Sequence, residues 1–424
     1  MTDRRGDDAS DREPARLSFL GRPNLDMGNE IDERATRCTG DGTTRATRRT
    51  FLTAAAAGGA IGLSGCLSGL PGFGDEESVR IPPLAEFRGS GTLVEGRPAP
   101  GGTSIEDLPD LSGSLTIYLG GGEGGIYTEL LDLLEETYPD FSATVDSDSS
   151  ASHAQNVVEE VNAGASEADV FWSIDVGSLA FVAENDAYDP LPSDAIGDVP
   201  AAYRGDDDAW AGVAGRARSV PYNTDALSAS EIPDAVRTFP DTEALRGTMG
   251  WAPTYGAFKS FVTAMRLLRG DDATRSWLES MDTAGTERFG NEFVVSQQVA
   301  DGALDAGFAN HYYAMRVKNE RPDAPIDLAF TEGDAGALVN VAGVLQVQGT
   351  GKGDLVANFA RHLLSAEVQE FFATTSFAYP MIPEVGPVGD LPTIDELNPP
   401  DIDLSELQDQ QRTLEIMDQA GVSG

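Results

Sequence analysis

Apolar runs of strand length alternate with amphipathic runs of helix length along much of this chain, and this alternation limits the folds open to it. The run "SLTIYLG" at 114–120 is rich in β-branched residues, and a glycine-rich turn separates it from the amphipathic "IYTELLDLLEETY". Further along, "ALDAGFAN" precedes "HYYAMRVKNE" in the same way. Alternation of this kind predicts parallel sheets covered by helices on both faces. The stretch 111–424 is long enough for two lobes of ordinary size.

Four loops with distinctive chemistry fall where predicted strands end and the next helices begin. In doubly wound sheets such loops meet at the carboxyl edge of the sheet, where ligands bind. We therefore expect a single cleft. The loops are "GGGEGG" at 120–125, "SIDVG" at 173–177, "PTYGAF" at 253–258 and "NHYY" at 310–313.

The chain is strongly acidic, and this excludes one class of partner. It has 70 Asp plus Glu against 29 Lys plus Arg, a formal net charge of −41. Because a phosphate backbone would be repelled, nucleic acid is not expected as a partner. Lysine occurs only at Lys259, Lys318 and Lys352, and the acidic residues are spread over the whole chain. Such a surface is typical of a halophilic protein, because high salt screens the self-repulsion.

The N-terminal region has the features of an export signal followed by a lipid-attachment site. Arg48 and Arg49 form a twin-arginine pair, and residues 51–63 are a short apolar run. The sequence "LSGC" at 63–66 matches the lipobox, after which a diacylglyceryl group is attached to Cys66. The apolar run is shorter than the roughly 20 residues that a membrane span needs. We therefore predict twin-arginine export and a lipid anchor in the membrane at the extracellular face of the cell; a buried alanine-rich helix is the alternative.

The sequence predicts three consecutive parts. Residues 1–65 form the leader, in which a stretch of 47 residues, polar overall and mixed in charge, precedes the arginine pair. This length raises the hypothesis that translation starts at Met27 rather than at Met1. Residues 66–110 are rich in Gly, Pro and Ser and are expected to form a tether. Residues 111–424 form the folded body.

Two adjacent tyrosines, Tyr312 and Tyr313, follow a predicted strand at the point where a helix begins. A phenol ordinarily has a pKa near 10, so a phenolate at neutral pH needs a strong cation beside it. A pair of phenolates suits a hard, highly charged metal ion such as Fe(III), which favours anionic oxygen ligands. In the first turn of a helix the two side chains can diverge around one point. The dipeptide alone leaves open an aromatic pair in the core or along a sugar site.

Six blocks of the sequence occur in one order and together point to a known family. They are "ADVFWSIDVGSLAFVAENDAYDPL", "WAGVAGRARSVPYNTDAL", "MGWAPTYGAF", "GALDAGFANHYYAMRVKNE", "DAGALVNVAGVLQV" and "AYPMIP". In this order the chain resembles the ferric-ion-binding proteins of bacterial ABC importers across most of residues 114–385. The resemblance implies a two-lobed α/β fold of the periplasmic-binding-protein-like type II class, with crossing hinge strands and a central cleft. Its crossovers imply a lobe 1 at about 111–216 and 340–395 and a lobe 2 at about 217–339 and 396–424.

The resemblance also implies a site for Fe(III) with a synergistic anion, which would be carbonate, phosphate or citrate. Tyr312 and Tyr313 would be the paired phenolate ligands. A glycine turn that opens a helix presents free N–H groups to an anion. Gly256 could instead serve only the turn, and Asn310 could serve only as a helix cap. The residues implied for the anion are Tyr255, Gly256, Ala257, Asn291, Asn310 and Arg216.

Two ligands that the family takes from lobe 1 are missing from their usual places. The family's histidine falls on Gly122, and its glutamate falls on Ile174. Glu123 and Asp175, each one residue further along, are candidate substitutes. Tyr255 is a candidate third phenolate, as in the branches of the family that bind iron through tyrosines alone.

The three histidines are expected to stay outside the coordination sphere of a metal. His311 precedes the tyrosine pair in the same helical turn, where a side chain seldom shares one metal ion with both neighbours. We expect it beside the site or at the surface. His153 and His362 lie in polar, helical stretches and are expected to be solvated. No zinc spacing, Walker A sequence or nucleophile elbow occurs in the sequence.

These features predict a lipid-anchored, monomeric, non-enzymatic binding protein that passes Fe(III), or a ferric chelate, to an ABC permease and its ATPase. Closure of the lobes about the hinge would bring the ligands together. One alternative is another solute in the same fold, either a sugar phosphate, molybdate or sulfate, or thiamine held by Trp172, Trp251 and Tyr255. A secreted enzyme, such as a hydrolase or a redox protein, is the alternative from another class.

Overall fold

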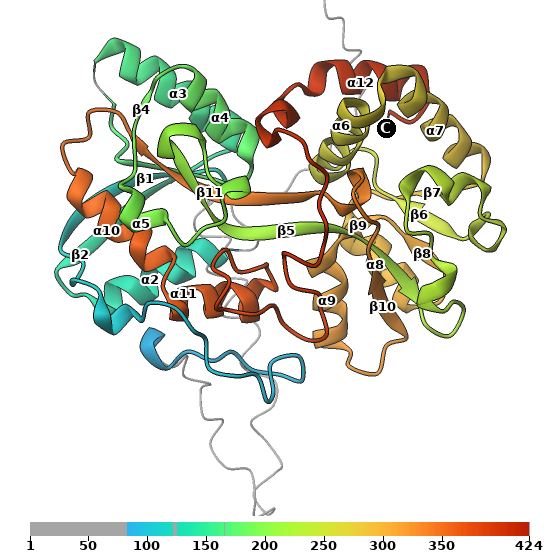
Figure 1. The fold of residues 1–424 in the computed structure, drawn as a ribbon, viewed down its shortest axis with the longest axis horizontal. Helices are drawn as coiled ribbons and strands as arrows, with labels where there is room; N and C mark the ends of the chain where they lie inside the picture. The colour runs from blue at the N-terminus through green and yellow to red at the C-terminus, as the bar shows by residue number, and fades with distance from the viewer. Residues whose placement is uncertain (1–82, 122–124, 165, 424) are drawn as a thin grey trace, which may run out of the picture. The chain divides into compact units, whose positions relative to one another are not determined.

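A mixed sheet runs through the described part of the chain, and its two ends belong to two lobes (Figure 1). The computed structural model describes residues 83–121, 125–164 and 166–423. The strands follow the order β2 (Phe141–Ser147), β1 (Gly113–Leu119), β3 (Val170–Ser173), β11 (Val339–Val347), β5 (Trp210–Asn223), β8 (Ala306–Gly307), β6 (Met249–Trp251) and β7 (Glu287–Arg288).

Lobe 1 is built around parallel strands rich in β-branched residues. β1 pairs in parallel with β2 and with β3, and β4 (Tyr188–Asp189) pairs with β11. The hydrophobic core of this lobe includes Trp172, Phe359 and Phe371, which are fully buried. Its helices lie around the sheet (Figure 1) and are α2 (Ile126–Thr137), α3 (Ser150–Ala163), α4 (Val176–Glu184), α5 (Ser193–Ile196), α10 (Gly353–Leu363) and α11 (Ala366–Phe371).

Lobe 2 has shorter strands and a hydrophobic core of its own. β6 pairs in parallel with β7 and β8, whereas β9 (Ala309–Asn310) and β10 (Ile326–Ala329) pair with β5. Trp251, Phe261 and Phe308 lie in a core cluster separate from that of lobe 1. The helices of lobe 2 are α6 (Gly256–Arg269), α7 (Asp271–Thr283), α8 (Glu292–Ala300), α9 (His311–Glu320) and α12 (Gln410–Gln419).

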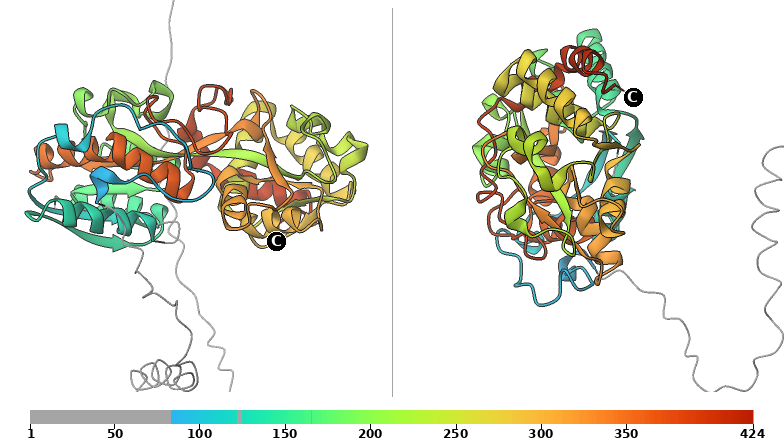
Figure 2. Two further views of the ribbon diagram at one scale, coloured as in Figure 1. Left: turned by 90° about the horizontal axis from the view of Figure 1, so that it is seen from below. Right: turned by 90° about the vertical axis from the view of Figure 1, so that its right-hand side faces the viewer.

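Strands β5 and β11 cross from one lobe to the other, as Figure 2 also shows. β5 pairs with β11 from Trp210 to Ala217, and from Arg218 to Asn223 it pairs with strands of lobe 2. The change of partner therefore falls between two neighbouring residues. The predicted two-lobed α/β fold with crossing strands is confirmed.

The C-terminal segment contacts both lobes. The short helix η10 (Leu404–Gln408) lies against α4, where a Cβ added to Gly177 would come within 2.9 Å of Gln408 Cβ. The following helix α12 buries Ile416 and Met417 in the core of lobe 2. Gly177 is thus required by this close approach, and a larger residue there would push the segment away from lobe 1.

The described part of the predicted tether, residues 83–110, is packed against the body. Leu84 and Phe87 are buried, and the ring of Phe87 lies 5.1 Å from that of Phe371 on α11. Arg97 forms an ion pair of 2.9 Å with the buried Glu370. The prediction of a tether is therefore wrong for these residues. Their composition is rich in Gly and Pro, but the apolar side chains between the Gly and Pro residues pack on lobe 1.

The predicted leader lies outside the described residues. This applies to Arg48, Arg49, the lipid-attachment Cys66 and the choice between Met1 and Met27. Within the described ranges, we find no helix that is both long enough and apolar enough to cross a membrane.

Candidate functional site

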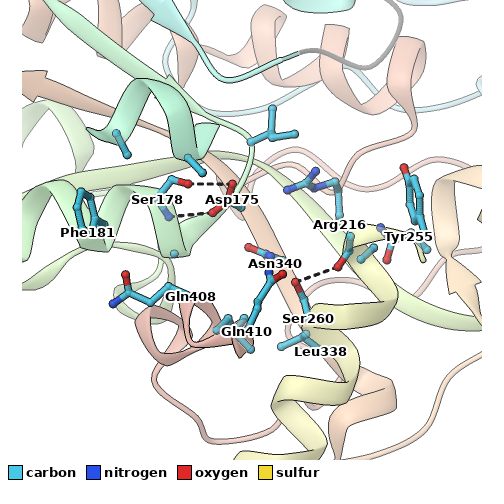
Figure 3. A pocket seen from close by; sticks show the side chains of 18 of the residues that line it. Asp175, Ser178, Phe181, Arg216, Tyr255, Ser260, Leu338, Asn340, Gln408 and Gln410 are labelled. Carbon is cyan, nitrogen blue, oxygen red and sulfur yellow. Dashed lines mark hydrogen bonds between the residues drawn. The ribbon is translucent and has the colours of Figure 1, made fainter. Parts of the chain in front are cut away.

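A cavity of about 580 Å³ lies between the lobes, and side chains from both lobes and from the crossing strands line it (Figure 3). Lobe 1 contributes α3 and the start of α4, and lobe 2 contributes the starts of α6 and α9. Residues of β5, β11 and η10 complete the wall. A solute in this cavity would touch both lobes at once.

Tyr312 and Tyr313 occupy the first turn of α9, which begins at His311 directly after β9. Tyr312 lines the cavity and is 4% exposed, and Tyr313 is 9% exposed. Their ring centroids are 4.2 Å apart at an interplanar angle of 45°. The two phenols therefore lie side by side at the lobe 2 wall, and they are not exposed to bulk solvent far from the cleft.

Tyr255 joins the pair from a different helix. It is the N-cap residue of α6 and lines the cavity, and its hydroxyl group is hydrogen-bonded to that of Tyr313. The ring centroids of these two residues are 6.1 Å apart. Three phenols from two helix starts are thus contiguous, and a cation that displaced their protons could bind more than one of them.

The start of α6 offers an environment suited to an anion. Gly256 and Ala257 line the cavity, and the N-cap Tyr255 makes no side-chain capping bond to their backbone. The first N–H groups of a helix and its macrodipole favour negative charge. Arg216 also lines the cavity, and in Figure 3 its guanidinium group lies between Asp175 and Tyr255. The predicted anion residues Tyr255, Gly256, Ala257 and Arg216 therefore share one wall region.

Asn310 lies in the cavity wall and belongs to a buried charged network. Its Oδ1 accepts a hydrogen bond of 3.3 Å from Arg218 Nη1, and its backbone N–H donates to Glu292 Oε2 at 2.8 Å. Arg218 also forms a buried ion pair with Glu292. The side chain of Asn310 makes no capping bond to α9, so its alternative role as a side-chain cap is wrong.

Arg218 lines the cavity but was overlooked in the sequence. It is 3% exposed, and its Nη2 has no hydrogen-bond partner among the described residues. The signal was available, because side chains two residues apart on a strand share one face. Arg216 and Arg218 on β5 have this spacing, so the block "GRAR" could have predicted two cations rather than one.

Asn291 lies outside the cavity wall. It is exposed, and its Oδ1 accepts a hydrogen bond of 2.9 Å from the backbone N–H of Val294, which makes it the side-chain N-cap of α8. The structure thus brings together five of the six predicted anion residues and separates Asn291 from them. The N-cap role in α8 explains why an asparagine occupies position 291.

On the lobe 1 side, Asp175 lines the cavity as the N-cap of α4. Its Oδ1 accepts from the Ser178 N–H at 2.8 Å, and its Oδ2 accepts from the Ser178 hydroxyl at 3.2 Å. Each carboxylate oxygen retains a lone pair, so Asp175 can still face a cation. Ile174 also lines the cavity, whereas Gly122 and Glu123 lie outside the described residues.

The histidines are more buried than the sequence suggested. His153 is 1% exposed and stacks on Tyr118, and His362 is fully buried with its Nε2 3.0 Å from the Tyr138 hydroxyl. The prediction that both are solvated is wrong, because each helix turns its histidine toward the core of lobe 1. His311 is buried as well, and burial lowers its pKa to about 4.

The aromatic sandwich expected for thiamine is not formed. Trp172 and Trp251 are fully buried in the cores of lobe 1 and lobe 2, and neither lines the cavity. Only Tyr255 of that set faces the site. The geometry does not favour this alternative.

This fold and cavity define a class of protein, namely a two-lobed protein that holds a solute between its lobes. The chain belongs to the family of bacterial extracellular solute-binding proteins, whose model matches residues 166–403. The family is one of binding proteins, not an enzyme class.

Curated relatives share more than a quarter of the aligned residues. The major ferric iron-binding protein of Neisseria meningitidis serogroup B is 29% identical over 265 residues, which cover 61% of this chain and 78% of the relative. The Fe(3+)-binding periplasmic protein of Serratia marcescens is 27% identical over 263 residues, which cover 61% of this chain and 77% of the relative.

Solved structures with the same fold include iron-bound HitA from Pseudomonas aeruginosa, with a TM-score of 0.63 and 23% identity. The Trichodesmium protein IdiA (FutA), in complex with iron and citrate ligands, has a TM-score of 0.61 and 20% identity. Each likeness covers 73% of this chain and 99% of the solved chain. These likenesses confirm the type II periplasmic-binding-protein fold.

Proposed function

We propose that this protein captures Fe(III), free or as a chelate, between its lobes and delivers it to an ABC permease with its ATPase. The observation that carries this proposal is that Tyr255 and Tyr312 line the interlobe cavity and that Tyr313 contacts both of them. Relatives that are named for ferric iron support the same solute.

The chemistry of the wall suits a hard trivalent cation. Three phenolates would balance the charge of Fe(III), and anionic oxygen is the ligand type that this ion favours. Within the described ranges, no group of three or more His, Cys, Asp and Glu residues could hold a metal ion. The phenols are therefore the main hard donors there, and binding would release their protons to solvent.

A synergistic anion would complete the coordination from a position next to the phenols. The start of α6, at Gly256 and Ala257, supplies N–H groups, and Arg216 supplies a positive charge next to them. Carbonate, phosphate and citrate all have oxygens that could bind this wall and the metal together. Asp175, and Glu123 from outside the described residues, are the candidate donors from lobe 1.

Closure of the lobes is the proposed mechanism. Among the described strands, only β5 pairs with strands of both lobes, and β11 pairs with it on the lobe 1 side. A ligand held by groups of both lobes stabilises the closed state by its differential affinity for that state. Release at the permease would then require opening of the same hinge.

The proposed place of action is the extracellular face of the cell membrane. The twin-arginine pair Arg48 and Arg49 would direct export, and a lipid on Cys66 would anchor the mature, monomeric protein. Because residues 83–110 dock on the body, a flexible spacer would have to end before Pro83.

The test is the visible absorption of the protein with ferric citrate. Phenolate bound to Fe(III) gives a charge-transfer band, so we expect colour on addition of the metal and a large loss of its intensity in Tyr312→Phe or Tyr313→Phe. Tyr188→Phe is the matched control, because Tyr188 lies on β4 and does not line the cavity. A wild-type protein that stays colourless at saturating ferric citrate would refute the proposal.

A second candidate solute is a tetrahedral oxyanion without a metal. The observation that favours it is the pair of cavity arginines, Arg216 and Arg218, beside the start of α6. Titration calorimetry with sulfate or molybdate in the absence of iron separates the two. Tight binding of either anion alone, with no binding of ferric citrate, would select this candidate.

A further inference from the structure

The strand β5 passes from one lobe to the other at a single peptide step. Ala217 pairs with Val339 of β11, and Arg218 pairs with Asn310 of β9. The N–H of Arg218 donates to Leu338 O at 2.8 Å, on the β11 side. This step is therefore where rotation of one lobe relative to the other would first change the pairing of β5.

The side chain of His311 binds the backbone at this step. Its Nδ1 accepts a hydrogen bond of 3.2 Å from the N–H of Ala217, and its Nε2 lies 2.7 Å from the carbonyl oxygen of Phe377. Nδ1 also lies 3.3 Å from the Ala217 carbonyl oxygen. Because the carbonyl oxygen of Phe377 can only accept, the proton of the neutral imidazole is on Nε2, and Nδ1 is left to accept from the Ala217 N–H. The imidazole thus accepts a backbone hydrogen bond that, in a regular sheet, would go to a neighbouring strand.

Phe377 belongs to a third chain segment that runs beside the same step. Tyr379, two residues on, exchanges two backbone hydrogen bonds with Gly215 of β5, at 2.8 and 2.9 Å. The ring of Tyr379 lies 4.6 Å from that of His311. Phe377 itself has a φ of 60°, which is uncommon for a residue other than glycine and requires support from its surroundings. His311 supplies part of that support.

His311 is also the first residue of α9, directly before the phenol pair. Its ring meets that of Tyr312 edge to face, with centroids 5.8 Å apart. We propose that His311 is a positioning residue that fixes the Tyr312 and Tyr313 phenols relative to the hinge step of β5. This proposal rests on the proposed function, because it names the residue that links the ferric site to lobe movement.

Two variants of the full-length protein separate the two hydrogen bonds of the imidazole, one to Ala217 and one to Phe377. In His311→Asn, the amide oxygen can accept from the Ala217 N–H, but the side chain is too short to reach Phe377 O. In His311→Gln, the amide nitrogen can donate to Phe377 O, and the bond to Ala217 is lost. His362→Asn is the matched control, because His362 is an equally buried histidine that uses both ring nitrogens, far from the hinge in lobe 1.

The first readout is ferric affinity, followed through the charge-transfer band with ferric citrate. We expect both His311 variants to keep the band at saturation, because the phenols remain, and to bind roughly tenfold more weakly, as expected when a buried partner is left unpaired. His362→Asn should lower the melting temperature and leave the affinity within about twofold. Unchanged affinity in both His311 variants would overturn the proposal.

The second readout does not need iron. Hydrogen exchange should accelerate at the Ala217 amide in His311→Gln, stay close to wild type in His311→Asn, and not change in His362→Asn. Equal exchange at this amide in His311→Gln and the wild type would overturn the link to the hinge. A wild-type protein without a charge-transfer band would instead refute the proposed function, and the exchange data would still decide whether His311 holds the hinge step.

Discussion

The meeting of Tyr255, Tyr312 and Tyr313 depends on where two helices begin. α9 starts directly after β9, so its first turn places adjacent phenols side by side, and α6 starts with Tyr255 as its N-cap. The tyrosine pair could be predicted because it followed an apolar run and preceded a helical one. Arg218 could have been predicted from its spacing to Arg216 on β5. The burial of the histidines could not, because it depends on which helix face meets a core that other segments build.

Removal of the third phenol should weaken ferric binding without abolishing it. In Tyr255→Phe we expect a charge-transfer band of lower intensity and an affinity reduced about tenfold or more, because one anionic donor of three is lost. Absorbance titration with ferric citrate measures both. If Tyr255→Phe bound like the Tyr188→Phe control, Tyr255 would be hydrogen-bonded to Tyr313 without ligating the metal.

The buried His362 should make the protein less stable as the pH falls. Burial lowers its pKa below the ordinary value of about 6.5, so below that value the unfolded chain binds a proton that the folded chain does not. The contribution of His362 to the unfolding free energy is therefore fully present above about pH 6.5, and it is lost as the pH falls from there toward the lowered pKa of the folded chain. In His362→Asn the unfolding free energy should depend less steeply on pH, with a slope that is smaller by at most about 1.4 kcal/mol per pH unit.

Urea unfolding at several pH values between about 5 and 7, at constant high salt, measures this difference. His311 and the carboxylates contribute to the slope in both proteins, so the comparison of variant with wild type isolates His362. Parallel curves for the two proteins would show that His362 titrates alike in the folded and unfolded chains.

Among the elements, the segment 83–110 departs furthest from what its composition suggested. The strand and helix alternation of the body follows from periodic apolar residues, which local sequence reveals. In this segment the buried residues Leu84, Phe87, Val94 and Ile105 have no regular spacing, and Gly and Pro separate them. Val94 packs in the same cluster as Tyr312 and Tyr313, so the segment also supports the back of the phenol wall.

Truncation of Leu84 should therefore destabilise the whole body. Leu84 is fully buried in the lobe 1 core, and Leu84→Ala is expected to cost about 2–5 kcal/mol of unfolding free energy. Leu414→Ala is the control, since Leu414 is 43% exposed and should change stability by no more than about 0.5 kcal/mol. Urea unfolding measures both. A loss at Leu84 as small as at Leu414 would mean that this segment does not belong to the folded unit.

At the scale of the whole molecule, the net charge of −41 dominates. Self-repulsion of this size opposes the compact state unless salt screens it, and the screening length grows from about 3 Å at 1 M to about 10 Å at 0.1 M. The same screening would limit long-range attraction of a cation, so recognition of the proposed Fe(III) would depend on contacts inside the cavity. Composition alone was sufficient to predict this charge repulsion, because the net charge does not depend on how the chain packs.

Stability should accordingly fall when salt is removed. On dilution from about 1 M to about 0.1 M KCl we expect the melting temperature to drop by several degrees. Sorbitol at matched osmolality serves as the control, since it does not screen charge. A melting temperature that sorbitol preserves as well as KCl does would point to hydration rather than to charge repulsion.

The docking of Leu84 and Phe87 has a mechanical consequence. Among the described residues, a load applied from the N-terminal side of the chain would reach these two side chains first, and they are fixed to the core that contains Phe371. If the proposed lipid anchor holds the N-terminus, it also holds lobe 1, and closure would be a movement of lobe 2 relative to a stationary lobe 1. A receiving permease would then find one docking half always in place and would sense cargo through the arrival of the other.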